Sequence, residues 1–529
     1  MPETRRRAYV RGGAFAAAYR PLRDGPVDAL LTATAAAHPQ RIAVADGLRH
    51  LTFAQLDAAA SAAAAMLRRE VGTGAVVAVA SGLSIDFAVA YYAVLRSGNV
   101  VAPINPLLRE PDLAHNLGVA RVRAAFADRT LGQRLASIRD GLPELIRLFG
   151  FDLLRELADD PAAAGAAEPA GEPEPQRAAD PDGIASVLFT SGTTGVAKAV
   201  ALTHRNLTAN AVQTVRAHRI SAGSTCLNHV STYQAMHVNS AVLAGATQVL
   251  CADPDLTRSF VLANGYRATH YYSLPARLNR LASDPRLAGL RFTTVRAVGS
   301  GGSALSPLAA HHLADRLGVA VFQGYGLAET APLVTSATPE DPAPGTVGRP
   351  VPGTECRIVD PDTGVVVGAQ DPGEVQVRGP QVMVGYLAAD GGVEPAGGGW
   401  FATGDIGRLD ARGRLVLLDR RKDLFKRDNW LVSPIALEQR LARHGAVLDC
   451  AVVDLPDEIS GAVPHALLVL RDGVEPGTVR AILDWANIRA PYYEHIADAT
   501  VLDAIPRSAN GKIQRRSLRD LLVARRRAA

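Results

Sequence analysis

The sequence predicts an α/β protein with a large N-terminal part and a small α+β part at its C-terminal end. Helical and strand-like patterns alternate from residue 27 to residue 130, and the residue composition and apolar pattern change near residues 395–420. Alternation of this kind favours sheets that are largely parallel, because each strand is followed by a helical crossover. The chain has 529 residues. At about 150 residues per domain, this length allows roughly three to four units of domain size.

Local signals place the first elements. An alanine-rich stretch with helical spacing runs from Leu51 to Leu67, and Thr52 is a suitable N-cap for it. Apolar runs over Ala75–Ala80 and Val100–Ile104 predict buried strands. The residues between these strands, Ile85–Arg96, have the pattern of a helix. This order of strand, helix and strand supports the α/β prediction.

Two later segments differ from these first elements in composition and apolar pattern. Residues 158–183 are rich in Pro, Gly, Ala and Glu without apolar periodicity, which predicts a flexible surface loop inside the large part. Short strands are expected around Gly413, over Arg414–Leu418. The residues from 420 onward have apolar alternation of their own, over Val447–Val453 and Ala466–Leu470. They are numerous enough for a small α+β domain.

Composition excludes several classes of protein. Hydrophobic residues make up 48% of the chain and charged residues 20%, which supports packed cores and excludes wholesale disorder. The net charge of +4 comes without a long Lys/Arg block, so nucleic-acid binding is disfavoured. No run approaches the roughly 18 apolar residues of a membrane span. The four cysteines are too far apart for a CxxC motif or a disulfide framework, which predicts a reducing cytoplasm.

The most informative segment is LFTSGTTGVAKAV, from Leu188 to Val200. An apolar strand over Ala185–Phe189 leads into a turn of small and hydroxyl residues, namely Thr190, Ser191, Gly192, Thr193 and Thr194. Lys198 follows, and it is one of only four lysines in a chain that otherwise uses arginine. Close backbone N–H groups, hydroxyls and an ammonium suit a polyphosphate. The segment is not a Walker A loop, because Ala197 and Ala199 flank the lysine.

This segment resembles the phosphate-binding loop of the adenylate-forming superfamily, which includes acyl- and aryl-CoA ligases, peptide-synthetase adenylation domains and firefly-type luciferases. The family loop usually reads SGTTGxPKG. Further segments match the family in the expected order: Val298–Leu305, Gln323–Thr330, Trp400–Asp405, Asp419–Asp423 and Pro506–Arg515. The resemblance covers about residues 27–520 and is closest to acyl- or aryl-CoA ligases.

The resemblance implies a role for individual residues in binding ATP and Mg²⁺. The turn from Thr190 to Thr194 and Lys198 would hold the phosphates, and the segment with Gly301 and Gly302 would border adenine and the acyl group. Tyr325, followed by Gly326, would stack on adenine, and Glu329 would ligate Mg²⁺. Asp405 would accept hydrogen bonds from both ribose hydroxyls, and Arg420 would reach ribose and phosphate. Lys512 would be the catalytic lysine.

The same resemblance implies a division of the chain and a reaction in two steps. A large adenylation domain would span residues 1–418, and a small mobile domain, residues 419–529, would rotate about a hinge near Asp419. A carboxylic acid would attack ATP to give acyl-AMP and pyrophosphate. A thiol, most often that of CoA, would then displace AMP. The sequence leaves the oligomeric state open between monomer and homodimer.

Two departures from the family pattern open alternatives. Ala328 replaces the usual threonine, and the lost donor costs about 1–3 kcal/mol unless Thr330 or a water replaces it. Asp428-Asn429-Trp430 stands where a glycine-rich stretch is usual, which could narrow the passage for the pantetheine arm of CoA. An amine or other nitrogen nucleophile, or a carrier protein, is therefore an alternative acceptor. A nucleotide-binding scaffold without turnover is a third interpretation, which rests on Ala328 alone.

The acid is expected to bind near residues 229–245, beside Gly299 and Gly324. This stretch lacks the Asp that amino-acid-activating relatives use, so an α-amino acid is disfavoured. His229 and His237 are both candidates for the pocket-gating position of the family. Polar residues in the stretch suggest an aryl or functionalised acid; these are Tyr233, Gln234 and Asn239.

Overall fold

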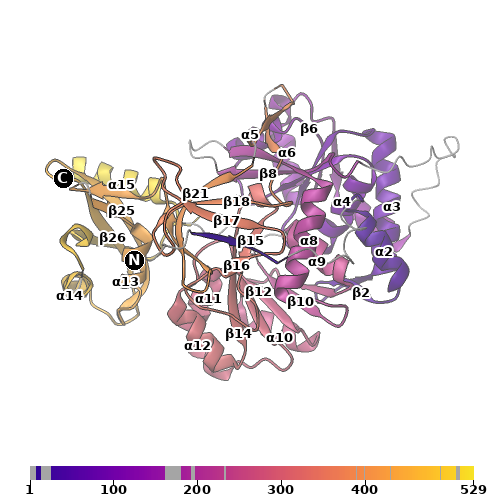
Figure 1. The fold of residues 1–529 in the computed structure, drawn as a ribbon. Coiled ribbons are helices and arrows are strands. Elements are labelled where there is room, and N and C mark those ends of the chain that lie inside the picture. Colours follow the sequence, from indigo (N-terminus) through magenta and orange to yellow (C-terminus); the bar gives the residue numbers. More distant parts are fainter. Residues whose placement is uncertain are drawn as a thin grey trace, which may run out of the picture.

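The computed structural model describes residues 8–13, 25–160, 180–191, 197–230, 234–388, 390–397, 399–428, 430–488, 490–507 and 513–528. A large α/β part carries a small part at one end (Figure 1). Most of the predicted loop over residues 158–183 lies outside the described residues. Among the described residues, no helix is both long enough and apolar enough to cross a membrane.

An eight-stranded sheet forms one layer of the large part, in the order β20-β19-β9-β8-β5-β4-β6-β7. Its strands are β4 (Val76–Ala80), β5 (Val100–Ile104), β6 (Val122–Ala127), β7 (Arg147–Gly150), β8 (Ile184–Ser191), β9 (Ala197–Thr203), β19 (Gly385–Leu387) and β20 (Val393–Pro395). The strands β8, β5, β4, β6 and β7 are parallel.

Helices cover both faces of this sheet, which explains why its central strands are continuous apolar runs. Val77 and Val79 of β4 face a core that includes α3 (Phe53–Glu70) and α4 (Ile85–Arg96). Ala78 and Ala80 face the opposite core, which includes α5 (Glu110–Val119) and α6 (Arg129–Ile138). The remaining early helices are α2 (Ala29–Ala37) and α7 (Phe151–Asp159).

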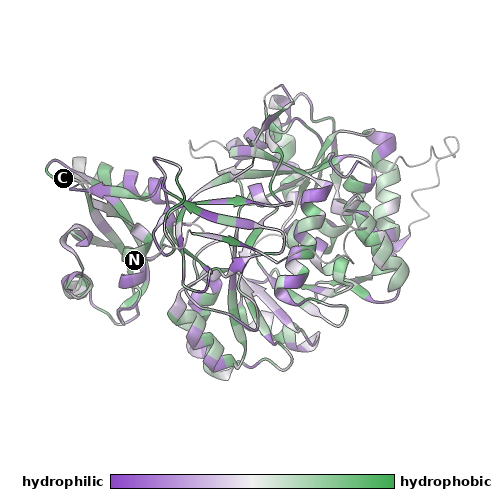
Figure 2. Ribbon diagram, in the orientation of Figure 1, coloured by the Kyte–Doolittle hydropathy of each residue, from purple (hydrophilic) through white to green (hydrophobic). Residues whose placement is uncertain are grey.

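A nine-stranded sheet forms the second layer, in the order β16-β15-β14-β13-β12-β10-β11-β2-β3. Its strands are β2 (Ile42–Ala45), β3 (His50–Thr52), β10 (Thr225–His229), β11 (Thr247–Leu250), β12 (His270–Ser273), β13 (Ala297–Ser300), β14 (Ala320–Gly326), β15 (Leu333–Ser336) and β16 (Arg349–Pro350). The strands from β14 through β2 are parallel. The helix α8 (His204–His218) precedes β10, and the helices that follow β10, β11, β12 and β13 are α9 (Ala235–Ala244), α10 (Leu256–Gly265), α11 (Pro275–Ala282) and α12 (Pro307–Leu317). Figure 2 shows these helices with hydrophobic and hydrophilic faces.

A third sheet of the large part has five antiparallel strands, in the order β1-β17-β18-β21-β22. They are β1 (Tyr9–Arg11), β17 (Glu355–Val359), β18 (Gly373–Arg378), β21 (Phe401–Leu409) and β22 (Leu415–Arg420). The strand β22 is the last element before the small part, so this sheet connects the two parts.

The small part is an α+β unit with its own core, as the sequence predicts. Its strands are β23 (Phe425–Arg427), β24 (Trp430–Val432), β25 (Val447–Asp457), β26 (Gly461–Leu470) and β27 (Asp498–Val501). Its helices are α13 (Pro434–Leu441), α14 (Val479–Asn487) and α15 (Arg515–Ala528). Leu437, Val452, Leu468 and Ile482 are among the residues of its core. The α/β class with an α+β C-terminal part is therefore confirmed.

Several predicted elements match the structure closely, and one predicted strand is shorter than the strand in the structure. The helix over Ile85–Arg96 and the strand over Val100–Ile104 have the predicted bounds. Thr52 is the N-cap of α3, and its side chain accepts a hydrogen bond from the Gln55 backbone N–H. The strand predicted to end at Phe189 continues to Ser191, because Thr190 and Ser191 pair with Lys198 and Ala197 of β9.

Candidate active site

Three predicted nucleotide-binding side chains contact one another although they come from three strands. Tyr325 lies on β14, Asp405 on β21 and Arg420 on β22. The Tyr325 hydroxyl donates to Asp405 Oδ2 at 2.5 Å, and Arg420 Nε lies 3.0 Å from Asp405 Oδ1. Burial, and then the charge of Asp405, raises the pKa of Tyr325 well above its usual value. A carboxylate has about four lone-pair sites, so Asp405 keeps acceptor capacity for a ligand.

The backbone beside Tyr325 requires glycine. The register of β14 against β15 shifts between Tyr325 and Gly326. A Cβ atom on Gly326 would overlap the carbonyl oxygen of Pro332. This close approach turns the chain into a short helix, Ala328–Thr330, that presents Glu329.

Thr330 does not replace the hydroxyl that Ala328 lacks. Its side chain is fully buried, and its Oγ1 contacts Leu327 and Pro332 within the turn. The hydroxyl accepts from the Leu327 N–H at 3.0 Å and donates to carbonyl oxygens. Because it stabilises the turn itself, the Thr330 alternative that the sequence left open is wrong.

Glu329 and Lys198 are brought together through a tyrosine that the sequence did not indicate. The Tyr386 hydroxyl donates to Glu329 Oε1 at 3.1 Å, and Lys198 Nζ lies 4.8 Å from the centre of the Tyr386 ring. The backbone N–H of Met383 donates to the Glu329 carbonyl at 2.8 Å. Burial, and then the charge of Glu329, raises the pKa of Tyr386. The contact depends on β19 pairing with β9, and no local pattern predicts such a long-range pairing.

The predicted phosphate turn is only partly described. Thr190 lies opposite Lys198 in the β8–β9 pair, so the two residues flank the connection between these strands. Gly192, Thr193 and Thr194 lie outside the described residues, and so does the side chain of Ser191.

The predicted glycines near the acid lie on neighbouring parallel strands. Gly299 of β13 pairs with Phe322 of β14, and Gly324 follows two residues later. A Cβ atom on Gly299 would lie 2.7 Å from the Tyr272 ring, so glycine is required there. Gly301 lies close to the Gly324 carbonyl, and Gly302 has a φ of +91°. Gly301 and Gly324 therefore approach other backbone closely at the carboxyl ends of β13 and β14, whereas Gly299 is packed against the Tyr272 ring.

His237 is the candidate gate that the structure places beside this region. It lies in the first turn of α9, and its ring centre is 4.7 Å from that of Tyr272. Burial lowers the pKa of His237 to about 4, so the imidazole is neutral at pH 7. Gln234 is exposed at the start of the same helix, and Tyr233 lies outside the described residues.

His229 and Asn239 have structural roles instead. His229 is fully buried, with Nε2 2.8 Å from the Asp253 carbonyl oxygen and Nδ1 3.1 Å from the Tyr271 hydroxyl. Asn239 donates to the Tyr91 hydroxyl at 2.9 Å and accepts from Tyr92 at 3.0 Å. Both side chains are satisfied within the core, which gives them structural roles, and the gating role considered for His229 and the pocket role considered for Asn239 stay predictions.

Asp419 lies at the junction of the two parts. It is the penultimate residue of β22, and its side chain is buried. Asp419 Oδ2 accepts from Ser433 Oγ at 2.7 Å and from the Ile435 N–H at 3.0 Å. Burial raises the pKa of this carboxyl. The last strand of the large part is thus bonded to the first helix of the small part.

Lys512 itself lies outside the described residues, but both flanks of its segment are held. Arg507 and Ile513 form a β-bridge. Arg507 Nη2 lies 2.8 Å from Asp449 Oδ1. On the other flank, Arg515 forms a bidentate pair with Glu438, whose Oε1 also accepts from the Val452 N–H at 2.7 Å.

Comparisons with known proteins match most of the chain. The model of the AMP-binding enzyme family matches residues 31–387, and that of the AMP-binding enzyme C-terminal domain matches residues 436–512. The chain is 32% identical to 4-coumarate–CoA ligase 2 of Oryza sativa subsp. japonica, over 92% of this chain and 90% of that protein.

Two solved structures extend the similarity to the fold. The o-succinylbenzoate CoA synthetase (MenE) from Bacillus subtilis, in complex with the acyl-adenylate intermediate OSB-AMP, has a TM-score of 0.80 and 26% identity. That similarity covers 94% of this chain and 98% of the other. The anthranilate CoA ligase AuaEII, in complex with anthranoyl-AMP, has a TM-score of 0.85 at 23% identity, with the same coverage of both chains.

Proposed function

This chain belongs to the AMP-binding enzyme family, and from that premise we propose that it joins a carboxylic acid to coenzyme A through an acyl-AMP intermediate. The observation that carries the proposal is the contact between Tyr325, Asp405 and Arg420. These residues belong to three separate motifs, and their convergence gives the groups that a nucleotide requires. Asp405 accepts from the ribose hydroxyls, and Tyr325 lies against the adenine.

The residues present fit a Mg²⁺ ion that is bound together with ATP. Glu329 is 9% exposed, and its Oε2 has no hydrogen-bond partner among the described residues. No cluster of three or more potential metal-ligating side chains occurs in the described part of the chain. Mg²⁺ commonly uses one or two carboxylates together with substrate phosphates and water. When bound, the ion supplies positive charge to the phosphate oxygens, and Glu329 is its protein ligand.

In the first step, an oxygen of the substrate carboxylate bonds to the α-phosphorus of ATP, and the bond to pyrophosphate breaks. No general base is needed, because the carboxylate is already ionised. Lys512 offsets the repulsion between the two anions and the charge that develops between them. Lys198 and the turn from Thr190 to Thr194 hold the departing pyrophosphate.

In the second step, a thiol sulfur bonds to the acyl carbon, AMP leaves, and the thiol proton passes to solvent. We place the boundary between residues 1–418 and 419–529, with Asp419 as the hinge about which the small part turns. The bonds from Asp419 to Ser433 and Ile435 support this assignment, because they join the hinge to the small part. Turning would remove Lys512 from the site and admit the thiol.

The proposed acid is an aryl acid. The 4-coumarate–CoA ligase relative and the solved anthranilate and o-succinylbenzoate ligases are named for aromatic acids. The Tyr272 ring lies beside Gly299, and the ring centre of the neutral His237 lies 4.7 Å from that of Tyr272, so flat side chains gather near this glycine. Stacking and apolar contact with an aromatic ring suit such a surface.

A second candidate acceptor is an amine or a carrier protein. Asp428 has a φ of +50°, and Trp430 is 53% exposed and stacks on Tyr493 with ring centres 5.0 Å apart. This acidic and aromatic hairpin stands where relatives carry small residues. It favours an acceptor other than the pantetheine arm if the hairpin faces the acyl-AMP.

The decisive experiment separates the two steps. Pyrophosphate exchange into ATP is measured with aryl, short, medium and long acids, and AMP release is then measured with CoA, amines or a carrier protein. We expect exchange with aryl acids and AMP release with CoA. Exchange without CoA-dependent AMP release would shift the assignment to the other acceptors, and no acid-dependent exchange would refute adenylation.

Lys512→Ala tests the catalytic assignment. We expect the exchange rate to fall by roughly 10²-fold or more, the size of effect found when one electrostatic stabiliser is removed. Thioester formation from supplied acyl-AMP should survive, because that step does not use the lysine. Equal loss of both half-reactions would contradict the assignment. Lys426→Ala, at a lysine of β23 without an assigned role, is the control.

A further inference from the structure

A pocket of about 650 Å³ opens at the amino ends of the parallel strands of the nine-stranded sheet. Its lining comes from the starts of β10, β12 and β13 and the loops before them, whereas the candidate active site lies at the carboxyl ends of β13 and β14. The pocket is therefore separate from that site. Its lining residues are Gly223, Thr225, Tyr266, Arg267, Thr269, Thr293, Thr294, Val295 and Arg296.

The pocket is positively charged. Arg267 and Arg296 belong to its lining, which contains no acidic residue. Both side chains are exposed, and neither guanidinium has a hydrogen-bond or ion-pair partner among the residues that the structure describes. Elsewhere in the large part, the half-buried Arg205 and the exposed Arg219 each pair with a carboxylate. Two unpaired guanidinium groups in one pocket favour an anionic ligand.

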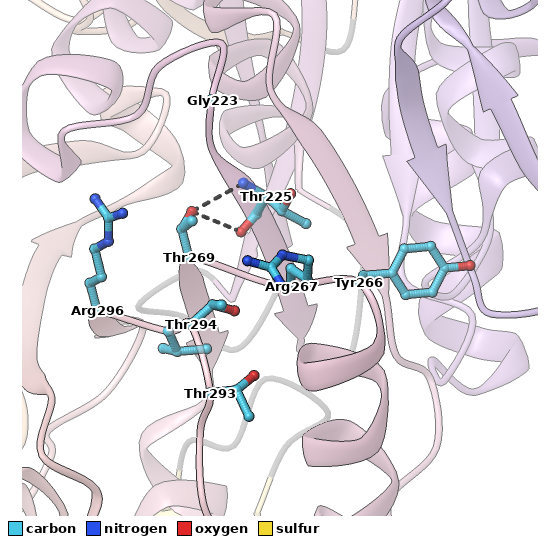
Figure 3. A pocket seen from close by; sticks show the side chains of 9 residues that line it. Gly223, Thr225, Tyr266, Arg267, Thr269, Thr293, Thr294 and Arg296 are labelled. Atoms are coloured by element: carbon cyan, nitrogen blue, oxygen red, sulfur yellow. Dashed lines mark hydrogen bonds between the residues drawn. The ribbon is translucent and has the colours of Figure 1, made fainter.

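Hydroxyl groups lie between the two arginines. Figure 3 shows Thr269 and Thr294 between Arg267 and Arg296 in this view, with Thr269 bonded to the backbone of Thr225. The Thr225 hydroxyl has no partner among the described residues, so it can donate to a ligand. Arg267 has a φ of +52°, a conformation that an arginine rarely adopts and that its loop maintains.

We propose that this pocket binds a small organic phosphate. The two guanidinium groups would hold the phosphate oxygens and the Thr225 hydroxyl would donate to them, because planar guanidinium groups match phosphate geometry. The pocket is open to solvent and has room for an organic phosphate as well as for the free ion. Tyr266, which is only partly buried, supplies apolar surface for the remainder of the ligand.

Calorimetric titration of the full chain with inorganic phosphate and with phenyl phosphate tests the proposal, against sodium chloride at equal ionic strength. We expect both phosphates to bind and phenyl phosphate to bind more tightly. The double variant R267E/R296E should weaken binding by about tenfold or more, the effect of losing charge-assisted hydrogen bonds. Arg258→Glu is the matched control, because Arg258 is exposed on the neighbouring α10 and outside the pocket.

The outcomes are separable from those of the proposed function. Equal binding by wild type and the double variant would mean that phosphate binds elsewhere, such as the candidate active site, and would overturn the proposal. Absence of binding to the wild type would also overturn it. If phenyl phosphate binds no more tightly than inorganic phosphate, the pocket is an ion site and the organic ligand is refuted. Thermal melts verify folding, and the single variants Arg267→Gln and Arg296→Gln repeat the test with smaller charge changes.

Discussion

The large and small parts of the molecule hold their candidate functional residues in different ways. In the large part, Tyr325 and Asp405 come from strands of two different sheets and contact each other directly, and Arg420, beside the proposed hinge residue at the end of β22, contacts Asp405. In the small part, the residues that flank Lys512 are bonded to α13 and β25 of the same part. The first arrangement depends on the packing of whole sheets. The second allows the small part to carry its lysine as one unit, which is what a rotating domain requires.

The largest expected effect concerns the small part. Glu438→Gln leaves the guanidinium of Arg515 without its bidentate partner, and the two side chains are only 12% and 16% exposed. Breaking a buried ion pair costs about 3–5 kcal/mol when the remaining charge is uncompensated, and Asp423, whose Oδ2 lies 3.9 Å from Arg515 Nε, reduces this cost towards the lower end. We expect hydrogen exchange, read by mass spectrometry, to accelerate in β25 and β26 while the large part is unchanged.

A surface pair of the same small part is the control. Arg480 and Asp484 lie one turn apart on α14 and are 82% and 58% exposed. Asp484→Asn should change stability by less than about 0.5 kcal/mol. If hydrogen exchange also accelerates throughout the large part of the Glu438→Gln variant, the two parts unfold together. That result would contradict the contrast between them.

Acidic pH should destabilise the large part, and the effect of each buried histidine should be smaller than that of Glu438→Gln on the small part. Burial is the main cause that lowers the pKa of His204, His229 and His237 to about 4 and that of His218 to about 3. In the unfolded chain, the pKa of a histidine is about 6.5. Below that pH the unfolded chain takes up protons that the folded chain does not, so stability is full above about pH 6.5 and falls as the pH decreases towards 4.

His229→Gln measures the contribution of one such histidine. Each contributes about 2 kcal/mol to the loss of stability between about pH 6.5 and pH 5, so the variant should lose less stability than wild type over this interval. The measured quantity is the change in the free energy of unfolding by urea between the two pH values, because the lost hydrogen bonds also lower absolute stability. His312→Gln, at an exposed position on α12, should keep the wild-type pH dependence. An unchanged dependence in His229→Gln would contradict the prediction.

The sequence predicts local structure and motif order more readily than contacts. The helix over Ile85–Arg96 has the predicted bounds because Ser84 caps its start and its apolar run is long. The end of β8 could not be predicted, because Thr190 and Ser191 join the strand through pairing with β9. His229 looked like a pocket residue in sequence, yet its partners Tyr271 and Asp253 come from later segments. Such partners are set by tertiary structure, which local patterns do not encode.

Tyr386 is the clearest contact that the sequence could not show, and its removal gives the smallest expected effect. Tyr386→Phe keeps the ring beside Lys198 but removes the hydroxyl that donates to Glu329. A hydrogen bond to a charged group contributes about 1.5–3 kcal/mol, and the Mg²⁺ proposed at Glu329 would partly compensate for its loss. We therefore expect pyrophosphate exchange to slow by about tenfold or less, with a higher Mg²⁺ requirement.

Tyr9→Phe removes a comparable tyrosine–glutamate bond, to Glu355 in the five-stranded sheet, and should leave exchange unchanged. Equal effects of the two variants would mean that Tyr386 acts through general stability, and a large loss in Tyr386→Phe alone would mean that contacts between sheets control the metal ligand more strongly than proposed.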